Sequence, residues 1–584
     1  MSGFLYRIAA LSALFIAITT CASAQTDMDL EHTDASGRMI CGTIPFNDGK
    51  EMEAVANTAR NNPALYQKMM NASKSTKENR RYVAGDDYPF FVRDRNTNQY
   101  VTVNATLMYN GRYAQIWVDN LDTARVKKTT LATLGKALDS STAPSSRNPS
   151  QGIIQNDIDV FGNYRDQFNQ DGQIWFLMTD IKDGFSGGAF VAGFFSPWDQ
   201  TSQPGSNMLN MLYIDSHEGL GTQSASNLRD LMNTLAHEFQ HLIHYYTNNQ
   251  SEVFFNEGCS ETASIINGYA NRDNSGYLAN TNVNLFRWTY EDATGNLILA
   301  DYSRAMNFVY YLYDQYGEGF LHAFNQTHST GMKRIDDALN VIGVPPSWQA
   351  ILKGFAVANY TIKNVDYFRY RYNKPVTTGS PKADTNALKT TGSVSVAPYA
   401  ISYFTLNKPT ARTLRFTSSG QTPYTVMAIF YKGASVIEVK ELAGNTNYTI
   451  GGTPAYDKVV FGVVNLLAVG SANANANISW TTAAVASGVD DATSSTGGLA
   501  LTGIAPTPSA GSATISFVSG GSAPLTLQIF DASGSLVRTM IDGDQISAGA
   551  HQIPVSTDGM ANGVYMVRLL QGTAMVNSRM VVIK

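Results

Sequence analysis

The chain has 584 residues, of which 43% are hydrophobic and 15% are charged, and its formal net charge is −5. A chain of this length can form several domains, and its apolar fraction allows each of them to bury a core. The sparse, slightly negative charge argues against a protein that binds nucleic acid or an anionic membrane surface.

Residues 1–24 predict a secretory signal peptide. Arg7 precedes the apolar run Ile8–Ile18, and the small residues at 22–24 stand where such peptides are cleaved. We therefore expect cleavage before Gln25 and a mature chain that is secreted or lies at the outer cell surface. The run is too short to span a bilayer, and no later stretch reaches the roughly 18 apolar residues of a membrane helix.

Residues 25–80 are polar and predict an N-terminal arm or a propeptide, with helix over Lys50–Ser73. From residue 81 onward, alternating apolar residues and Asn/Gly turns indicate a mixed sheet. Strands are predicted at Tyr88–Arg93, Gln99–Tyr109, Tyr113–Val118, Gln173–Asp180 and Ser206–Asp215, and a helix at Lys127–Leu138.

A longer helix is predicted over Asn227–Tyr246. Its apolar residues recur at three and four positions, which is the period of a stripe that faces a core. Ser226 or Asn227 can accept the free backbone N–H groups of its first turn.

This helix contains the pattern HExxH. His237 and His241 are four residues apart, so they lie on one face and can bind one zinc ion through bonds of about 2.1 Å. Glu238 projects beside the metal, where it can take a proton from metal-bound water. His244 shares the face, but the rise of roughly 10 Å from His237 is too long for one ion. We expect His244 to be a packed or surface histidine.

A third ligand must come from another segment. After a polar turn at Thr247–Ser251, the stretch Phe255–Glu261 predicts a second helix with Glu257 and Glu261 on one face. One of these carboxylates can bind the zinc, while the other accepts the free ring N–H of a ligand histidine and fixes its tautomer.

HEFQHLIHY at 237–245, followed by FNEGCSE at 255–261, resembles the gluzincin metallopeptidases, most closely the hyicolysin-like branch. The resemblance implies a zincin-like (thermolysin-like) catalytic domain over residues 81–375. It makes His237, His241 and Glu257 the zinc ligands and Glu238 the general base. Glu261 would support His237.

The same resemblance implies further roles. In Asp301–Leu312, which predicts the opening of another helix, Tyr302 would stabilise the oxyanion formed during hydrolysis. His322 and His328 are the fallback candidates. Ser206–Asp215 would be either the edge strand that binds an extended peptide by strand addition or an ordinary strand of the sheet.

The remainder of the chain predicts helices and then two all-β domains. Residues 262–372 are mostly helical and would form the lower lobe of the catalytic domain. Short alternating strands over 385–482 predict a β-sandwich, and the composition of 483–503 is that of a flexible linker. The fold class expected is therefore a multidomain α+β protein, with a zincin-like domain followed by two all-β sandwich domains.

The last module, residues 504–584, contains PTPSAGSATISF, LQIFDASGSLVRTM, GVYMVRLLQG and SRMVVIK. These segments resemble the C-terminal sorting domains of proteins exported by type IX secretion. The resemblance implies that the secretion machinery is a partner of this module, and that the chain crosses the outer membrane to be released or attached at the surface.

Three cysteines occur, and Cys21 is expected to leave with the signal peptide. Cys41 and Cys259 then remain in an oxidising compartment, where a disulfide between them is one explanation, although spacing alone cannot assign it. The alternative is that the Cys41 thiolate plugs the zinc of a latent precursor. No motif around Cys41 indicates this role.

The function expected is that of a secreted zinc-dependent endopeptidase, with Zn²⁺ as cofactor and protein or peptide substrates. Whether the Asp- and Asn-rich loops also hold structural Ca²⁺ stays open. The alternative is a catalytically inactive surface adhesin or binding protein built on the same scaffold. The intact HExxH pattern argues against it, because a binding scaffold has no need of a general base.

Overall fold

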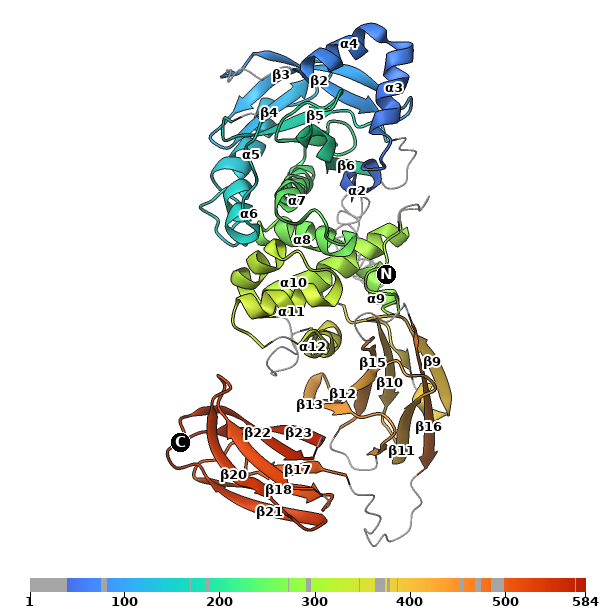
Figure 1. Ribbon diagram of the computed structural model, residues 1–584, viewed down its shortest axis with the longest axis vertical. Coiled ribbons are helices and arrows are strands. Elements are labelled where there is room, and N and C mark those ends of the chain that lie inside the picture. The colour runs from blue at the N-terminus through green and yellow to red at the C-terminus, as the bar shows by residue number, and fades with distance from the viewer. Residues whose placement is uncertain are drawn as a thin grey trace, which may run out of the picture. The chain divides into compact units, whose positions relative to one another are not determined.

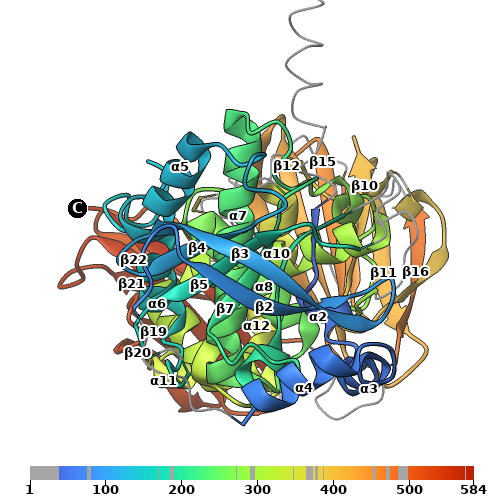
Figure 2. The same ribbon diagram turned by 90° about the horizontal axis from the view of Figure 1, so that it is seen from above.

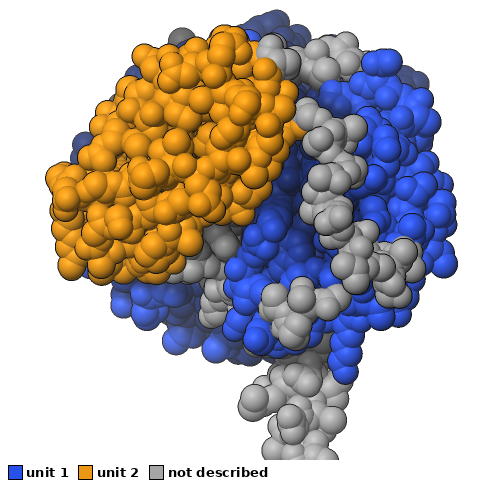
Figure 3. Space-filling view, turned by 90° about the horizontal axis from the view of Figure 1, so that it is seen from below, with its two compact units in different colours: residues 1–485 blue, residues 486–584 orange. Residues whose placement is uncertain are grey.

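The computed structural model divides the chain into two compact units, residues 1–485 and 486–584, which Figure 3 colours separately. The predicted signal peptide and most of the predicted linker lie outside the residues that the structure describes. Those residues are 39–74, 81–168, 170–183, 190–270, 272–289, 296–345, 347–362, 373–374, 379–385, 387–451, 456–467, 474–484, 498–521, 523–572 and 574–584.

A seven-stranded sheet forms the upper part of the first unit (Figure 1). Its spatial order is β1-β6-β7-β5-β4-β3-β2. The strands are β1 (Met39–Cys41), β2 (Asp87–Asp94), β3 (Gln99–Asn110), β4 (Ala114–Asp119), β5 (Ile174–Thr179), β6 (Phe190–Phe195) and β7 (Met211–Asp215). All five predicted strands are confirmed.

Strand β7 is an interior strand, paired with β5 on one side and β6 on the other. The expectation that Ser206–Asp215 is a peptide-binding edge strand is therefore wrong. Every residue of β4, β5, β6 and β7 is buried, because aromatic side chains cover one face of the sheet and helices cover the other. A strand that is buried on both faces has the same apolar sequence wherever it lies in the sheet, so the pattern could not place it.

The helices of the first unit lie against this sheet and below it. Seen from above, the strands pass over α7, α8 and α10 (Figure 2). The helices after β4 are α5 (Lys128–Asp139), α6 (Ile153–Phe161), α7 (Ala225–Asn248), α8 (Val253–Ile266), α9 (Ser275–Ala279), α10 (Asn296–Gln326), α11 (Gly331–Val341) and α12 (Trp348–Thr361). The predicted helices over Lys127–Leu138, Asn227–Tyr246 and Phe255–Glu261 are confirmed.

Two helix starts differ from the prediction. Helix α7 is capped by Ser224, not by Ser226 or Asn227. Asn227 is the third residue of a capping box, in which the Ser224 oxygen accepts its N–H at 3.2 Å and its own side chain accepts the Ser224 N–H at 3.3 Å. Helix α10 begins at Asn296 rather than at Asp301, so Tyr302 lies in its second turn.

The N-terminal arm contains α2 (Thr43–Phe46), α3 (Glu51–Asn61) and α4 (Pro63–Ala72). The single helix predicted over Lys50–Ser73 is thus two helices. Asn62 separates them because its side chain accepts the Leu65 N–H at 3.1 Å and the following proline is favoured as a first helical residue. Both helices pack on Tyr100 of β3, so the arm is part of the first unit.

Two further sheets complete the first unit, with orders β13-β12-β15-β10-β8 and β14-β11-β16-β9. They enclose an apolar core of their own, as a β-sandwich does. Their strands are β8 (Asp384–Thr385), β9 (Gly392–Val396), β10 (Ile401–Asn407), β11 (Arg412–Ser418), β12 (Tyr424–Lys432), β13 (Ser435–Leu442), β14 (Asn447–Ile450), β15 (Lys458–Asn465) and β16 (Ala476–Ala484).

The second unit contains two sheets, β17-β18-β21 and β20-β19-β22-β23, around a separate core. Its strands are β17 (Ala500–Ala505), β18 (Ser512–Ser519), β19 (Leu525–Phe530), β20 (Leu536–Asp544), β21 (Gly549–Ser556), β22 (Gly563–Gln571) and β23 (Ala574–Val582). The chain is therefore a multidomain protein that mixes helices and strands, as predicted. Among the described helices, none is long and apolar enough to cross a membrane.

Candidate metal centre

Helix α7 presents His237, Glu238 and His241 below the sheet, and all three side chains are buried. The two imidazole rings lie on one face of the helix, with their centroids 4.9 Å apart. Helix α8 returns alongside α7 and places Glu257 opposite them. Its Oε2 is 3.1 Å from Nε2 of His237 and 3.6 Å from Nε2 of His241. The predicted pairing of two histidines with one glutamate is thus present in space.

Cys41 joins these side chains from the far end of the sequence. Its Sγ lies 3.3 Å from Nε2 of His241 and 3.4 Å from Oε2 of Glu238. Cys41 and Cys259 are both free thiols, so the predicted disulfide alternative is wrong. Cys259 instead lies within α8 with its side chain in the core, where burial raises the pKa of its thiol to about 12.

The four residues Cys41, His237, His241 and Glu257 form what we call the donor cluster. One ligand atom from each lies within 4.8 Å of all the others. Nitrogen, oxygen and sulfur donors of this kind suit zinc, and four donors bound at about 2.1 to 2.3 Å in a tetrahedron are about 3.4 to 3.6 Å apart. Three of the six separations, at 3.1 to 3.6 Å, are close to that spacing, and none exceeds 4.8 Å.

A further observation supports the fit. Oε1 of Glu257 is buried and has no hydrogen-bond partner among the described residues. A buried carboxylate oxygen without a partner is costly, and a cation bound at this carboxylate would offset the cost. The donor cluster therefore fits a zinc ion in both chemistry and spacing.

Neighbouring side chains hold the two imidazoles by their other ring nitrogens. Oε1 of Glu261 is 3.5 Å from Nδ1 of His237, and Arg272 binds both carboxylate oxygens of Glu261. Asn256 Oδ1 lies 2.9 Å from Nδ1 of His241. Such contacts fix the ring orientation and tautomer of a metal-binding histidine.

Neither Asn256 nor Arg272 was predicted from the sequence to support a histidine. Asn256 immediately precedes Glu257 on α8, and that adjacency was an available signal. Arg272 lies outside both helices, and no local pattern distinguishes it from other arginines.

Opposing effects set the pKa values within the donor cluster. Burial would raise the pKa of Glu257, but the charge of His241 and hydrogen bonds from both histidines lower it to about 2. Burial would likewise lower the pKa of His241, but Glu257 raises it above its ordinary range. Burial and the nearby Glu238 and Glu257 raise the pKa of the Cys41 thiol. These shifts therefore reflect burial and the mutual electrostatic contacts of the clustered side chains.

Tyr302 lies at the same centre. It is fully buried, and its ring centroid is 6.3 Å from that of His237. Its hydroxyl donates to the carbonyl oxygen of Cys41 at 3.3 Å and accepts the Cys41 N–H at 3.2 Å. Burial raises the pKa of Tyr302, so the side chain remains a neutral hydrogen-bond donor.

The other histidines considered from the sequence lie elsewhere. His322 and His328 are exposed and are not part of the donor cluster, and their fallback role stays a prediction. His244 is buried against Asn325, with Nδ1 and Oδ1 3.0 Å apart, which confirms it as a packed histidine.

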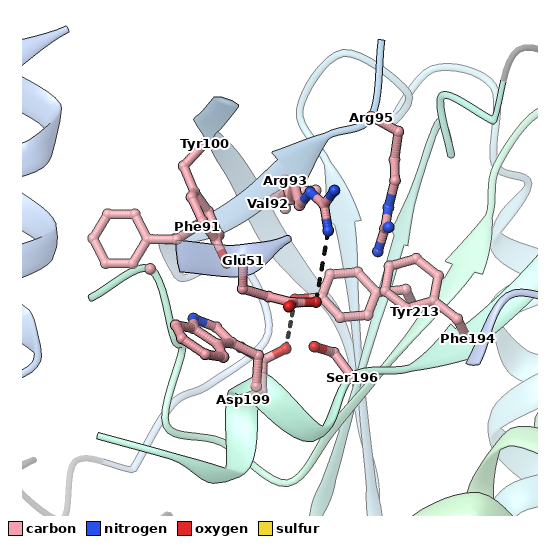
Figure 4. A pocket seen from close by; sticks show the side chains of 12 residues that line it. Glu51, Phe91, Val92, Arg93, Arg95, Tyr100, Phe194, Ser196, Asp199 and Tyr213 are labelled. Carbon is pink, nitrogen blue, oxygen red and sulfur yellow. Dashed lines mark hydrogen bonds and ion pairs between the residues drawn. The ribbon is translucent and has the colours of Figure 1, made fainter. Parts of the chain in front are cut away.

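A small cavity of about 20 Å³ lies on the other side of β6, between the arm and the sheet (Figure 4). Two pairs of polar groups in its lining contact each other. Arg93 is 3.6 Å from Glu51, and Tyr213 donates to Asp199 at 2.7 Å. A space of this size holds about one water molecule. We interpret the polar pairs around this cavity as contacts that fix α3 to the sheet, and we do not interpret the cavity as a substrate site.

Comparison with known proteins gives two informative matches. Residues 503–584 match the family described as "Secretion system C-terminal sorting domain". The chain is also 29% identical over 201 residues to "Neutral metalloprotease ShpI" of Staphylococcus hyicus. Both resemblances drawn from the sequence are confirmed. The match to the protease spans 34% of this chain and 39% of the relative.

Solved structures add nothing to this picture. A β-glucuronidase of Faecalibacterium prausnitzii matches at 13% identity, over 31% of this chain and 36% of that one, with a TM-score of 0.14. A β-glucuronidase of Ruminococcus gnavus matches at 13% identity, over 36% and 41%, with a TM-score of 0.13. Scores this low do not indicate a shared fold.

Proposed function

We propose that this chain is a secreted zinc-dependent endopeptidase with a zincin-like catalytic domain over residues 81–375. The observation that carries the proposal is the convergence of His237 and His241 from α7 with Glu257 from α8, beside Glu238. The similarity to a neutral metalloprotease supports it. We propose His237, His241 and Glu257 as the zinc ligands.

A zinc ion held there would supply a Lewis acid that polarises the scissile carbonyl and acidifies the attacking water. The protein's own task is to move the proton. Glu238 is buried, and its Oε2 faces the donor cluster at 3.4 Å from Sγ of Cys41. We propose that this carboxylate takes the proton of the attacking water and passes it to the leaving amine nitrogen.

Tyr302 would stabilise the charge that develops on the carbonyl oxygen. Its hydroxyl already donates to a backbone carbonyl within the site, that of Cys41. A donor fixed in a dry site stabilises an oxyanion far better than water does, because it need not reorient during the reaction. Arg272 packs over the tyrosine ring, 4.7 Å from its centroid, and helps to keep it in place.

The supporting contacts have a role in the same scheme. Glu261 would orient His237, and Asn256 would orient His241. Each holds the ring so that Nε2 points at the metal position.

The C-terminal module would direct export. The match to a secretion sorting family supports passage through secretion machinery and a place outside the cell or on its surface. The signal peptide at 1–24, the domain limits and a role for Ca²⁺ stay predictions.

The experiment that tests the proposal compares the zinc-loaded protein with Glu238→Gln. Both are treated with a trace of protease to cut the N-terminal arm, the protease is quenched, and casein cleavage is measured. We expect the parent to cleave casein and Glu238→Gln to bind zinc equally but cleave at least about a hundredfold more slowly. If both bind zinc and neither cleaves, the inactive binding protein becomes the better explanation.

A further inference from the structure

We propose that Cys41 is a fourth zinc ligand, and that residues 41–43 form a plug that keeps the catalytic centre closed while the N-terminal segment is in place. The inference rests on the proposed function, because it concerns the same metal. It goes beyond that function by assigning a regulatory role to a segment that takes no part in hydrolysis.

The thiol occupies the position that a catalytic metal keeps open. A catalytic zinc has three protein ligands and one place for water, whereas four protein ligands make a closed site. Sγ of Cys41 is 3.3 Å from Nε2 of His241, and it lies beside Glu238, on the side of the site where the general base would meet water. Cys41 would bind as the thiolate, and its proton is released to solvent.

The plug also engages the proposed base. The Thr43 hydroxyl donates to Oε2 of Glu238 at 2.8 Å and accepts the backbone N–H of Phe195 at 2.8 Å. Glu238 is thereby held by a neutral partner on the oxygen that faces the donor cluster. The Thr43 hydroxyl thus takes one acceptor position of the Glu238 oxygen that an attacking water would approach.

The plug also forms hydrogen bonds with the hydroxyl of Tyr302, the group that we propose stabilises the oxyanion. This hydroxyl bonds to both the N–H and the carbonyl oxygen of Cys41. The base, the oxyanion donor and the fourth metal position are thus all covered by three consecutive residues. A core segment that packed there only for stability would have no reason to cover all three groups at once.

The approach of the plug follows the geometry of peptide binding. Strand β1 adds to β6 in parallel at the margin of the sheet, and Gly42 N–H continues the pairing to Gly193 O at 2.9 Å. Without β1, the main chain of β6 would be exposed for strand addition by another peptide. We therefore infer that the N-terminal segment occupies the groove that a substrate would use.

Gly42 is required for this close approach. A Cβ at Gly42 would lie 2.7 Å from the Val191 side chain and 3.0 Å from Cβ of Phe194, both on β6. On the other side, Arg272 donates to the carbonyl oxygen of Met39 at 2.9 Å. The plug is held firmly by many contacts, but none of them is covalent.

An accessible point for release follows directly in the chain. Residues 47–50 are exposed, lie between α2 and α3, and contain Gly49 with a φ of 72°. Exposed loop tips with small and polar residues are preferred sites of cleavage. Hydrolysis of one peptide bond there, by an endopeptidase that cuts after lysine, would separate the plug from the arm helices that anchor it.

The decisive test replaces zinc by Co²⁺ in the full chain. Thiolate bound to Co²⁺ gives a ligand-to-metal charge-transfer absorption in the near ultraviolet, which nitrogen and oxygen ligands do not give. We expect this band in the parent and in Cys259→Ala, a matched removal of the other buried thiol, and we expect it to be absent in Cys41→Ser. A second readout is the rate at which a thiol reagent modifies each cysteine of the native protein. Bound metal should slow the modification of Cys41 and leave the rate at Cys259 unchanged.

The activity of the same proteins tests the plug. Without any proteolytic treatment, zinc-loaded Cys41→Ala should cleave casein about tenfold or more faster than the parent, because an intramolecular ligand competes at high effective concentration. Cys259→Ala should match the parent. Cys41→Ser serves as a second variant in case the alanine substitution impairs folding.

The outcomes separate the two proposals. If the parent binds one Co²⁺ and His241→Ala binds none, but the sulfur band is absent, the plug is refuted while the zinc site stands. If neither the parent nor His241→Ala binds Co²⁺, the proposed function fails, and the inference about Cys41 fails with it. A zinc-loaded parent cut after Lys50 that cleaves casein no faster than the uncut parent also refutes the plug.

Discussion

The ion pair of Glu261 with Arg272 gives the sharpest test of how the centre is built. The side chains are 2% and 8% exposed, and Arg272 binds both carboxylate oxygens. Replacing Arg272 by Met leaves the Glu261 charge buried without its arginine partner, with only the His237 ring at 3.5 Å. Breaking a buried pair in this way costs about 3 to 5 kcal/mol. The free energy of unfolding of Arg272→Met should fall by that amount.

The double variant Arg272→Met/Glu261→Gln should recover most of the loss, because it removes the stranded charge together with its partner. It should remain about 1 kcal/mol less stable than the parent, since the hydrogen bond of Arg272 to Met39 is also lost. The exposed pair of Lys333 with Asp337 on α11 is the matched control. Replacing Lys333 by Met should cost less than about 1 kcal/mol.

The assay is urea unfolding followed by tryptophan fluorescence, in the presence of a chelator so that metal binding does not add to stability. All six tryptophans lie between residues 117 and 480. The signal therefore reports on the first unit and is silent for residues 486–584. A loss below 1 kcal/mol in Arg272→Met, or a double variant that is as unstable as the sum of the single variants, would refute the reasoning.

Three further outcomes are expected. Tyr302→Phe should lower kcat of the arm-cleaved enzyme by about ten- to a thousandfold with unchanged zinc content; an unchanged kcat would remove the hydroxyl from the mechanism. Asn256→Ala should weaken zinc binding by about 10- to 100-fold in competition with a chelator, while the exposed His328→Ala should bind as the parent does. In the metal-free protein the pKa of Glu257 is about 2. Its ionised form therefore stabilises the fold above about pH 4.5, and this contribution is lost as the pH falls toward 2. Glu257→Gln should flatten the dependence of the unfolding midpoint on pH in that window; a curve parallel to that of the parent would contradict the assignment.

Local patterns predicted the helix that contains His237 and His241, and the second helix that contains Glu257. This succeeded because both segments combine a strong apolar period with a polar turn between them, so their antiparallel packing follows from short-range signals. The five strands of the sheet were likewise visible as alternating or continuous apolar runs. Their order was not, because a buried strand has the same composition at any interior position.

The features that could not be predicted from the sequence mostly involve contacts between segments that are far apart in the chain. Strand β1 has three residues, too few to show a period, and it pairs with β6, which begins about 150 residues later. The start of α7 was misplaced by two residues because Asn227 can either cap a helix or complete a capping box, and only the backbone shows which. Arg272 could not be found because a buried ion pair leaves no local trace in a sequence.

Cys41 shows how a site can be complete without a motif. It lies 200 residues before His241, and its neighbours resemble no metal-binding signature, so spacing alone could offer only a disulfide or a plug. The structure excludes the disulfide, because both thiols are free and the Cys259 side chain points from α8 into the core. The plug needs no conserved spacing to the histidines: it needs a glycine that lets the chain lie flat on β6 and a hydroxyl two residues after the thiol. A short Cys-Gly-Thr segment meets both needs, and this is why so brief a sequence could close an active site assembled from α7, α8 and α10.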